Sequence, residues 1–209
     1  MIKIIISIIT ILTFSICNGQ YDWRAGKVVL KNGQTLKGIV KMTMPSNKLV
    51  SLSSSKVYYK KNRKGKVKKF TKDEIRKVFY GSYNSETGFF EYAPITKNKK
   101  ELFRVIINGK SKLYKRTVKN ISYSNRILDP SISPRRPRKK DIQFVNQYYV
   151  IRNGEITVTY IPDESLEKFK EKTISYFSDC KKIIQYIENN LYEEFEIKEL
   201  VEDYNIFCE

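Results

Sequence analysis

The stretch VVLKNGQTLK, residues 28–37, decides the fold class of this chain. Two β-prone runs flank Asn32-Gly33, and an Asn-Gly pair accepts the two positive φ angles of a type I′ turn, so the stretch predicts a β-hairpin. The same pair follows β-prone runs at Asn108-Gly109 and at Asn153-Gly154. Three such hairpins predict an antiparallel, β-rich body.

Further strands extend this pattern over residues 20–161. Residues 56–59 and 66–70 flank Asn62-Arg63-Lys64-Gly65 and predict a fourth hairpin. Ile156, Val158 and Tyr160 alternate with threonines, as in a strand with one buried face. With 209 residues, 41% of them hydrophobic, the chain suits one β-rich domain plus an appendage, and is neither collagen-like nor disordered. We expect its hairpins to form a small barrel or sandwich.

Residues 162–209 change to a helical period. An apolar stripe at steps of three and four residues predicts a long amphipathic helix, with Asp163 or Ser165 as its cap. The stripe consists of Leu166, Phe169, Thr173, Phe177, Cys180, Ile184, Ile187 and Leu191. A shorter helix is expected around residues 197–204. The sequence therefore predicts an α+β protein with a C-terminal helical hairpin that is packed on the β-rich domain or appended to it.

The N-terminus has the pattern of an export signal, residues 1–19. A positive start with Lys3 precedes an apolar run that is too short to cross a bilayer, and Cys17 and Gly19 satisfy the small-x-small rule for cleavage before Gln20. An uncleaved anchor, a buried helix and a lipoprotein acylated at Cys17 are the alternatives, although Ile16 is bulky where acylation favours a small residue. We expect a protein of the periplasm, cell surface or exterior, with no transmembrane span after cleavage.

Two cysteines, Cys180 and Cys208, remain after cleavage. An even number of cysteines in an oxidising compartment predicts a disulfide, with free buried thiols as the alternative. The chain contains no histidine, and two thiolates alone lack the four ligands of a zinc site. We therefore expect no metal.

The absence of histidine also excludes Ser-His-Asp and Cys-His hydrolysis. Phosphate-binding glycine motifs and the Gly-x-Ser-x-Gly elbow are missing too. Acidic residues near the C-terminus have no EF-hand spacing, and carboxylates on an exposed helix are usually solvated. We expect a non-enzymatic protein without a cofactor, with a carboxylate-dependent enzyme or one using Tyr or Lys chemistry as the alternative.

Charge is distributed unevenly along the chain. Residues 20–161 carry 33 Lys and Arg against 9 Asp and Glu, whereas residues 162–209 carry 6 against 13. Cations interleaved with aromatics are typical of surfaces that bind anionic polymers. The candidate anion-binding residues are Lys60, Lys61, Lys68, Lys69, Lys115, Arg116 and, in the proline-rich loop at residues 129–140, Arg135, Arg136 and Arg138.

A simpler interpretation has the aromatics facing the core while the lysines only solubilise the sheet and its edges. If the charge is functional, its partners are anionic envelope polymers, a lipid surface or released nucleic acid. The sequence predicts no recognition helix, so we expect no sequence-specific nucleic-acid binding.

Several short motifs resemble those of a group of small exported bacterial proteins of unassigned function. They are residues 26–38, 69–75, 102–110 with Leu113-Tyr114, 176–180, and 200–205 with Cys208. The resemblance covers most of the mature chain, and the basic loop at 134–140 departs from it. It implies no activity and no catalytic residue. The expected role is that of a binding or structural module of the bacterial cell envelope.

Overall fold

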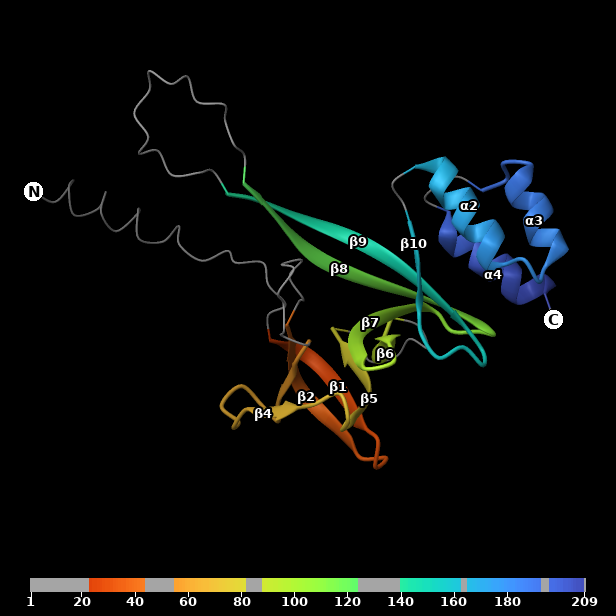
Figure 1. Cartoon of the computed structure of the whole chain (residues 1–209). Coiled ribbons are helices and arrows are strands. Elements are labelled where there is room, and N and C mark those ends of the chain that lie inside the picture. The colour runs from red at the N-terminus through yellow and green to blue at the C-terminus, as the bar shows by residue number, and fades with distance from the viewer. Residues whose placement is uncertain are drawn as a thin grey trace, which may run out of the picture.

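The computed structural model describes residues 23–43, 55–81, 88–123, 140–162, 165–192 and 196–208, and within them the chain forms one antiparallel sheet and three helices (Figure 1). The strands are β1 (Arg24–Leu30), β2 (Thr35–Met42), β3 (Val57–Lys60), β4 (Lys68–Phe70), β5 (Ile75–Tyr80), β6 (Phe90–Thr96), β7 (Lys99–Ile107), β8 (Ser111–Tyr123), β9 (Lys140–Arg152) and β10 (Thr159–Ile161). The helices are α2 (Leu166–Tyr176), α3 (Lys181–Glu188) and α4 (Ile197–Phe207). The predicted α+β class, with a β-rich body and a helical C-terminus, is confirmed. The predicted signal at 1–19 lies outside the described residues.

The sheet has the strand order β10-β9-β8-β7-β6-β5-β1-β2-β3-β4. Sequence neighbours pair throughout except that β5 returns to the free side of β1, which joins the first four strands to the rest. β5, β1 and β2 separate β6 from β3 in this order, yet the Tyr92 hydroxyl of β6 donates to the carbonyl of Ser55, just before β3, at 2.6 Å. The sheet is therefore curled. β8 and β9 pair over 13 residues each and form a ribbon that extends beyond the other strands (Figure 1).

The β1–β2 hairpin is confirmed, but its turn is not of type I′. A type I′ turn needs a positive φ at both residues, but only Gly33 has one, at 87°, and Asn32 does not. The Gly33 N–H donates to the Leu30 carbonyl at 3.1 Å, and the Leu30 N–H donates to the Gln34 carbonyl at 2.8 Å. This pattern is a type I turn followed by a left-handed glycine. Asn32 favours it because its side chain accepts the Gln34 N–H at 3.0 Å.

The remaining predicted hairpins also form. β3 pairs with β4, β7 with β8 at Asn108-Gly109, and β9 with β10 after Asn153-Gly154. The strand predicted from Ile156 is shorter than expected, because β10 spans only residues 159–161 and Ile156 is 70% exposed.

The predicted long helix is interrupted, so the C-terminus has three described helices in place of a helical hairpin. Ser165 caps α2, as the sequence allowed, by accepting the Lys168 N–H at 3.4 Å. The break at residues 177–180 includes Ser178-Asp179-Cys180, three residues of modest helix propensity. In α3 Ile183 is fully buried where the stripe predicts Ile184, whereas Ile187 is fully buried as predicted.

The apolar core occupies both faces of the sheet. On one face, β1, β2 and β5 bury Val28, Val40 and Val78. The helices pack further along on Leu113 and Val150, which are paired across β8 and β9. On the opposite face a third cluster surrounds Phe103 of β7, Tyr114 of β8 and Tyr149 of β9. No described helix is long and apolar enough to cross a membrane.

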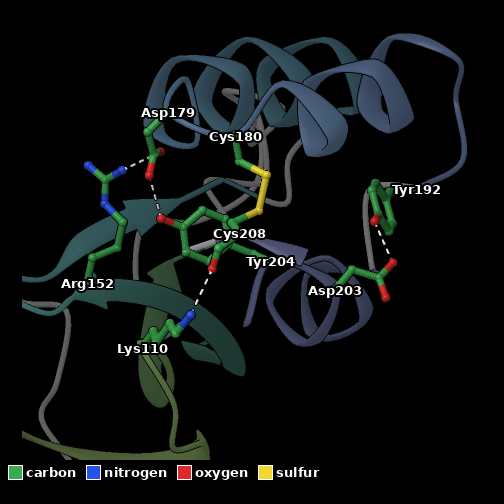
Figure 2. The surroundings of a disulfide bond; sticks show 8 residues. All are labelled: Lys110, Arg152, Asp179, Cys180, Tyr192, Asp203, Tyr204 and Cys208. Carbon is green, nitrogen blue, oxygen red and sulfur yellow. Dashed lines mark hydrogen bonds and ion pairs between the residues drawn. A yellow bond between two sulfur atoms is a disulfide. The ribbon is translucent and has the colours of Figure 1, made fainter. Parts of the chain in front are cut away.

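The predicted disulfide is confirmed. Cys180 at the start of α3 is joined to Cys208 at the end of α4, with an S–S distance of 1.99 Å and a Cα–Cα distance of 5.7 Å (Figure 2). Both cysteines are buried. The bond therefore fastens the last helix to the turn that separates the first two.

Candidate anion-binding cavity

A cavity of about 310 Å³ lies where β8 separates from β7, opposite the ends of β1 and β2. Four cationic residues line it, namely Arg24 of β1, Arg104 of β7, and Lys115 and Arg116 of β8. Among the described residues that line this cavity there is no aspartate or glutamate. The described wall of the site is therefore positive.

Strand register places three of these cations on one face of the sheet. Arg104 pairs with Phe90 on one side and with Lys115 on the other, and directly paired residues share a face. Phe90 pairs in turn with Val78, which pairs with Val28 of β1. Because alternate residues of a strand share a face, Arg24 lies on the same side as Val28. Arg24, Arg104 and Lys115 therefore stand on one face although they come from three strands.

Aromatic rings support two of these cations without neutralising them. The Arg24 guanidinium carbon lies 5.7 Å from the Tyr80 ring centre, and Lys115 Nζ lies 5.8 Å from that of Tyr148. Such contacts hold a cation through the ring quadrupole, yet its full positive charge remains. The cavity thus keeps its positive potential.

Arg116 has a different environment. Its guanidinium carbon lies 5.8 Å and 5.7 Å from the ring centres of Phe103 and Tyr149, and Nη2 donates to Gln147 Oε1 at 3.2 Å. Its Nε is buried and has no hydrogen-bond partner in the structure. Both rings belong to the cluster on the opposite face of the sheet, so the Arg116 guanidinium points away from the face that carries Arg24, Arg104 and Lys115.

Hydroxyl groups complete the polar lining. Thr43 Oγ1 accepts the Lys56 N–H at 2.8 Å, Ser55 Oγ donates to Glu101 Oε2 at 3.1 Å, and the Thr117 hydroxyl contacts Asn146 Oδ1 at 3.0 Å. The Thr43 hydroxyl is thus held in place by its acceptor side. Its hydrogen can be donated to a ligand.

Two carboxylates of the body, the buried Glu101 and the half-buried Glu91, are occupied elsewhere. Glu101 is 3% exposed and contacts Ser55, and its charge, together with the larger effect of burial, raises the pKa of Tyr92 to about 12. Glu91 accepts from Tyr114 at 2.5 Å and from Lys112 at 3.0 Å, and burial followed by this hydrogen bond raises the pKa of Tyr114. Both phenols are therefore neutral at physiological pH.

The structure divides the predicted anion-binding residues into two groups. Lys115 and Arg116 line the cavity, whereas Lys60, Lys61, Lys68 and Lys69 lie together on the β3–β4 hairpin. On that hairpin Lys60 Nζ lies 4.3 Å from the ring centre of Trp23. Arg135, Arg136 and Arg138 lie outside the described residues.

Sequence reasoning missed Arg24 and Arg104. A lone cation in a strand carries no functional signal of its own. The one sign was that Arg104 interrupts an apolar run, between Phe103 and Val105.

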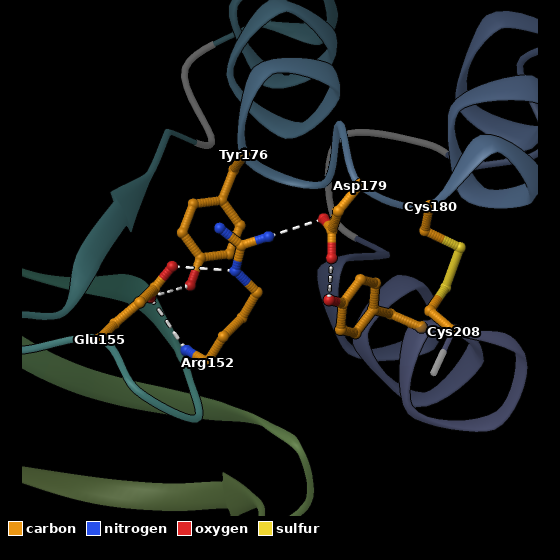
Figure 3. Close-up of polar contacts among 7 residues, drawn as sticks. Arg152, Glu155, Tyr176, Asp179, Cys180 and Cys208 are labelled. Atoms are coloured by element: carbon orange, nitrogen blue, oxygen red, sulfur yellow. Dashed lines mark hydrogen bonds and ion pairs between the residues drawn. A yellow bond between two sulfur atoms is a disulfide. The ribbon is translucent and has the colours of Figure 1, made fainter.

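A second cavity, of about 350 Å³, lies beside the disulfide, but its polar groups bind one another (Figures 2 and 3). Arg152 contacts Glu155 at 2.9 Å and Asp179 at 2.6 Å. Tyr204 donates to Asp179 at 2.6 Å and Tyr176 donates to Glu155 at 2.5 Å. These bonds connect the β9–β10 turn with α2, the α2–α3 turn and α4, so the network is structural.

The acidic residues near the C-terminus do not form a metal site in the described part of the chain. Glu202 contacts Lys198 at 3.3 Å, and Asp203 accepts from Tyr192 at 2.6 Å (Figure 2). Within the described ranges no three His, Cys, Asp or Glu residues come together as metal ligands would.

The chain matches no protein-family model, no curated protein and no solved structure. Its resemblance to a group of small exported proteins therefore stays a prediction.

Proposed function

We propose that the protein is an exported, non-enzymatic binding module of the bacterial cell envelope that holds anionic polymers on its basic β body, residues 20–161. One observation carries the proposal. Lys61, Lys68 and Lys69 are exposed on the β3–β4 hairpin and form no ion pair with any described carboxylate. They are cations whose charge is available to a partner.

The charge balance supports the same conclusion. The β body carries 33 Lys and Arg against 9 Asp and Glu, and three of its described carboxylates, Glu91, Glu101 and Glu155, already contact Lys or Arg. A field of this sign attracts any polyanion and orients the protein with the basic body first. Binding of this kind releases counterions and is independent of polymer sequence.

Export is supported by the N-terminal pattern and by the Cys180–Cys208 bond, because disulfides persist in oxidising compartments. In such a compartment the available polyanions are acidic glycans, lipid headgroups and released nucleic acid. All three present repeated oxyanions to the basic surface.

The test compares two double charge reversals in the mature chain. Lys68→Glu with Lys69→Glu changes the hairpin, while Lys172→Glu with Lys181→Glu makes the same change of net charge on exposed helical positions. Heparin affinity is measured between low and physiological salt. We expect the hairpin variant to bind about tenfold more weakly and to lower the salt slope by about one unit per lysine that contacts the polymer.

The helical variant should lose much less affinity. Equal losses in both variants, or no binding of the unaltered protein even at low salt, would contradict the proposal and leave the charge as a compositional property. Parallel measurements with anionic vesicles and single-stranded DNA identify which polyanion binds most tightly.

A further inference from the structure

We propose that the cavity lined by Arg24, Arg104 and Lys115 binds a single ligand the size of a sugar ring that carries a carboxylate or phosphate. This inference rests on the proposed function and deepens it, because such a ligand is one unit of an acidic envelope polymer. The β3–β4 hairpin supplies non-specific attraction, and the cavity selects the unit that enters it.

Charge is the first argument. The β7–β8 hairpin and the distant strand β1 place cations on one face of the sheet at this cavity, and no acid lines it among the described residues. Like charges held near one another repel, and an oxyanion placed between them relieves that repulsion while forming charge-assisted hydrogen bonds. Arginine is suited to this role because its planar fork matches a carboxylate or phosphate.

Size is the second argument. About 310 Å³ corresponds to the volume of roughly ten water molecules and lies at the small end of the range for small-molecule sites. A bare phosphate or carboxylate group fills only part of this space. The remaining volume accommodates the body to which the anion is attached.

The lining also offers partners for that body. Thr43 has a hydroxyl hydrogen available to donate beside the three cations. Leu102 and Met42 provide apolar walls nearby. Directed donors beside apolar surface are the combination that binding sites for small polar molecules use to fix orientation.

The experiment titrates the mature protein with four probes by calorimetry. Glucuronate and glucose 6-phosphate carry the two candidate oxyanions on the same ring, glucose lacks the charge, and inorganic phosphate lacks the ring. We expect one or both of the charged sugars to bind at least tenfold more tightly than glucose and phosphate. The tighter of the two identifies the oxyanion as carboxylate or phosphate.

Variants then locate the binding. Arg104→Gln and Lys115→Gln should each weaken the charged sugar by about tenfold or more, as expected for loss of a charge-assisted bond. The matched control is Arg76→Gln, an exposed arginine of β5 that does not line the cavity, and it should bind as the unaltered protein does. Thermal melts of all variants exclude a folding defect.

Failure to bind either charged sugar, or binding that Arg104→Gln and Lys115→Gln leave unchanged, would overturn the inference. Equal binding of inorganic phosphate would overturn the assignment to a sugar-sized ligand. These outcomes are separable from the proposed function. If the protein binds heparin but none of the charged sugars, only the inference about the cavity is wrong. If it binds a charged sugar in the cavity but not heparin, only the proposal of polymer binding is wrong.

Discussion

Breaking the Cys180–Cys208 bond should destabilise the protein by an amount that follows from the length of chain it closes. The two cysteines are 28 residues apart. On the loop-entropy model, closing a loop of that length is worth roughly 3–4 kcal/mol of unfolding free energy. Since domains unfold at about 5–15 kcal/mol in total, this is a large share of the stability.

The loss should lower stability without releasing α4 from the body. The Asn205 side chain accepts the Ser111 N–H at 2.7 Å and donates to the Ser111 carbonyl at 2.9 Å, so α4 also holds the first residue of β8 directly. Leu200 and Val201 of the same helix are fully buried. We therefore expect unfolding of the reduced protein to stay cooperative, with a melting temperature lower by roughly 10 °C for a chain of this size.

The assay compares urea unfolding of oxidised protein, of protein reduced with a phosphine, and of the double variant Cys180→Ala with Cys208→Ala. The reductant should destabilise the unaltered protein and leave the double variant unchanged, which controls for non-specific effects of the reductant. A difference below about 1 kcal/mol between oxidised and reduced protein would refute the loop-entropy reasoning. Quantitative alkylation of both thiols in native, unreduced protein would refute the bond itself.

Three further changes have defined outcomes. A Cβ at Gly109 would lie 2.7 Å from Asn205 Nδ2, so Gly109→Ala should displace the Asn205 hydrogen bonds and lower the unfolding free energy by about 1–2 kcal/mol. In a double-mutant cycle, most of this cost should disappear when Asn205→Ala is already present, and additive effects would contradict this. Phe103→Ala empties a fully buried ring site and should cost about 3–5 kcal/mol in urea unfolding, so a loss below 1 kcal/mol would show that the site is not packed as described. Burial raises the pKa of Glu155, but the hydrogen bond from Tyr176 and those from Arg152 outweigh it, so the pKa in the folded protein lies below its usual 4.5. The ionised Glu155 therefore stabilises the fold above pH 4.5, and this stabilisation is lost as the pH falls through the lower pKa of the folded state. Denaturation midpoints of Glu155→Gln and unaltered protein should therefore converge toward low pH, and a constant difference would contradict this.

Local signals were enough to predict most of the fold. The Asn-Gly pairs marked three chain reversals correctly, because this dipeptide favours a turn whatever surrounds it. The turn type at Asn32-Gly33 was wrong because it depends on which backbone group the Asn32 side chain contacts. The interruption between α2 and α3 was missed for a similar reason. An apolar stripe persists through residues 177–180, and only the bonds of Asp179 to Arg152 and of Cys180 to Cys208 show that these residues connect different elements.

The cavity could not be predicted from the periodicity of the sequence, because it depends on which strands are neighbours in the sheet. Lys115 and Arg116 were among the predicted anion-binding residues, but the sequence contains many cations and does not distinguish these two from the others. What distinguishes Arg24, Arg104 and Lys115 is that β5 pairs with β1 and that β8 pairs with β7 only as far as Lys115, so that their side of the sheet opens there. The β1–β5 pairing connects segments about 50 residues apart, a distance at which local propensity says nothing about which strands are neighbours. A binding site assembled by long-range strand pairing is therefore invisible in composition, and its position depends on the same pairings that close the core.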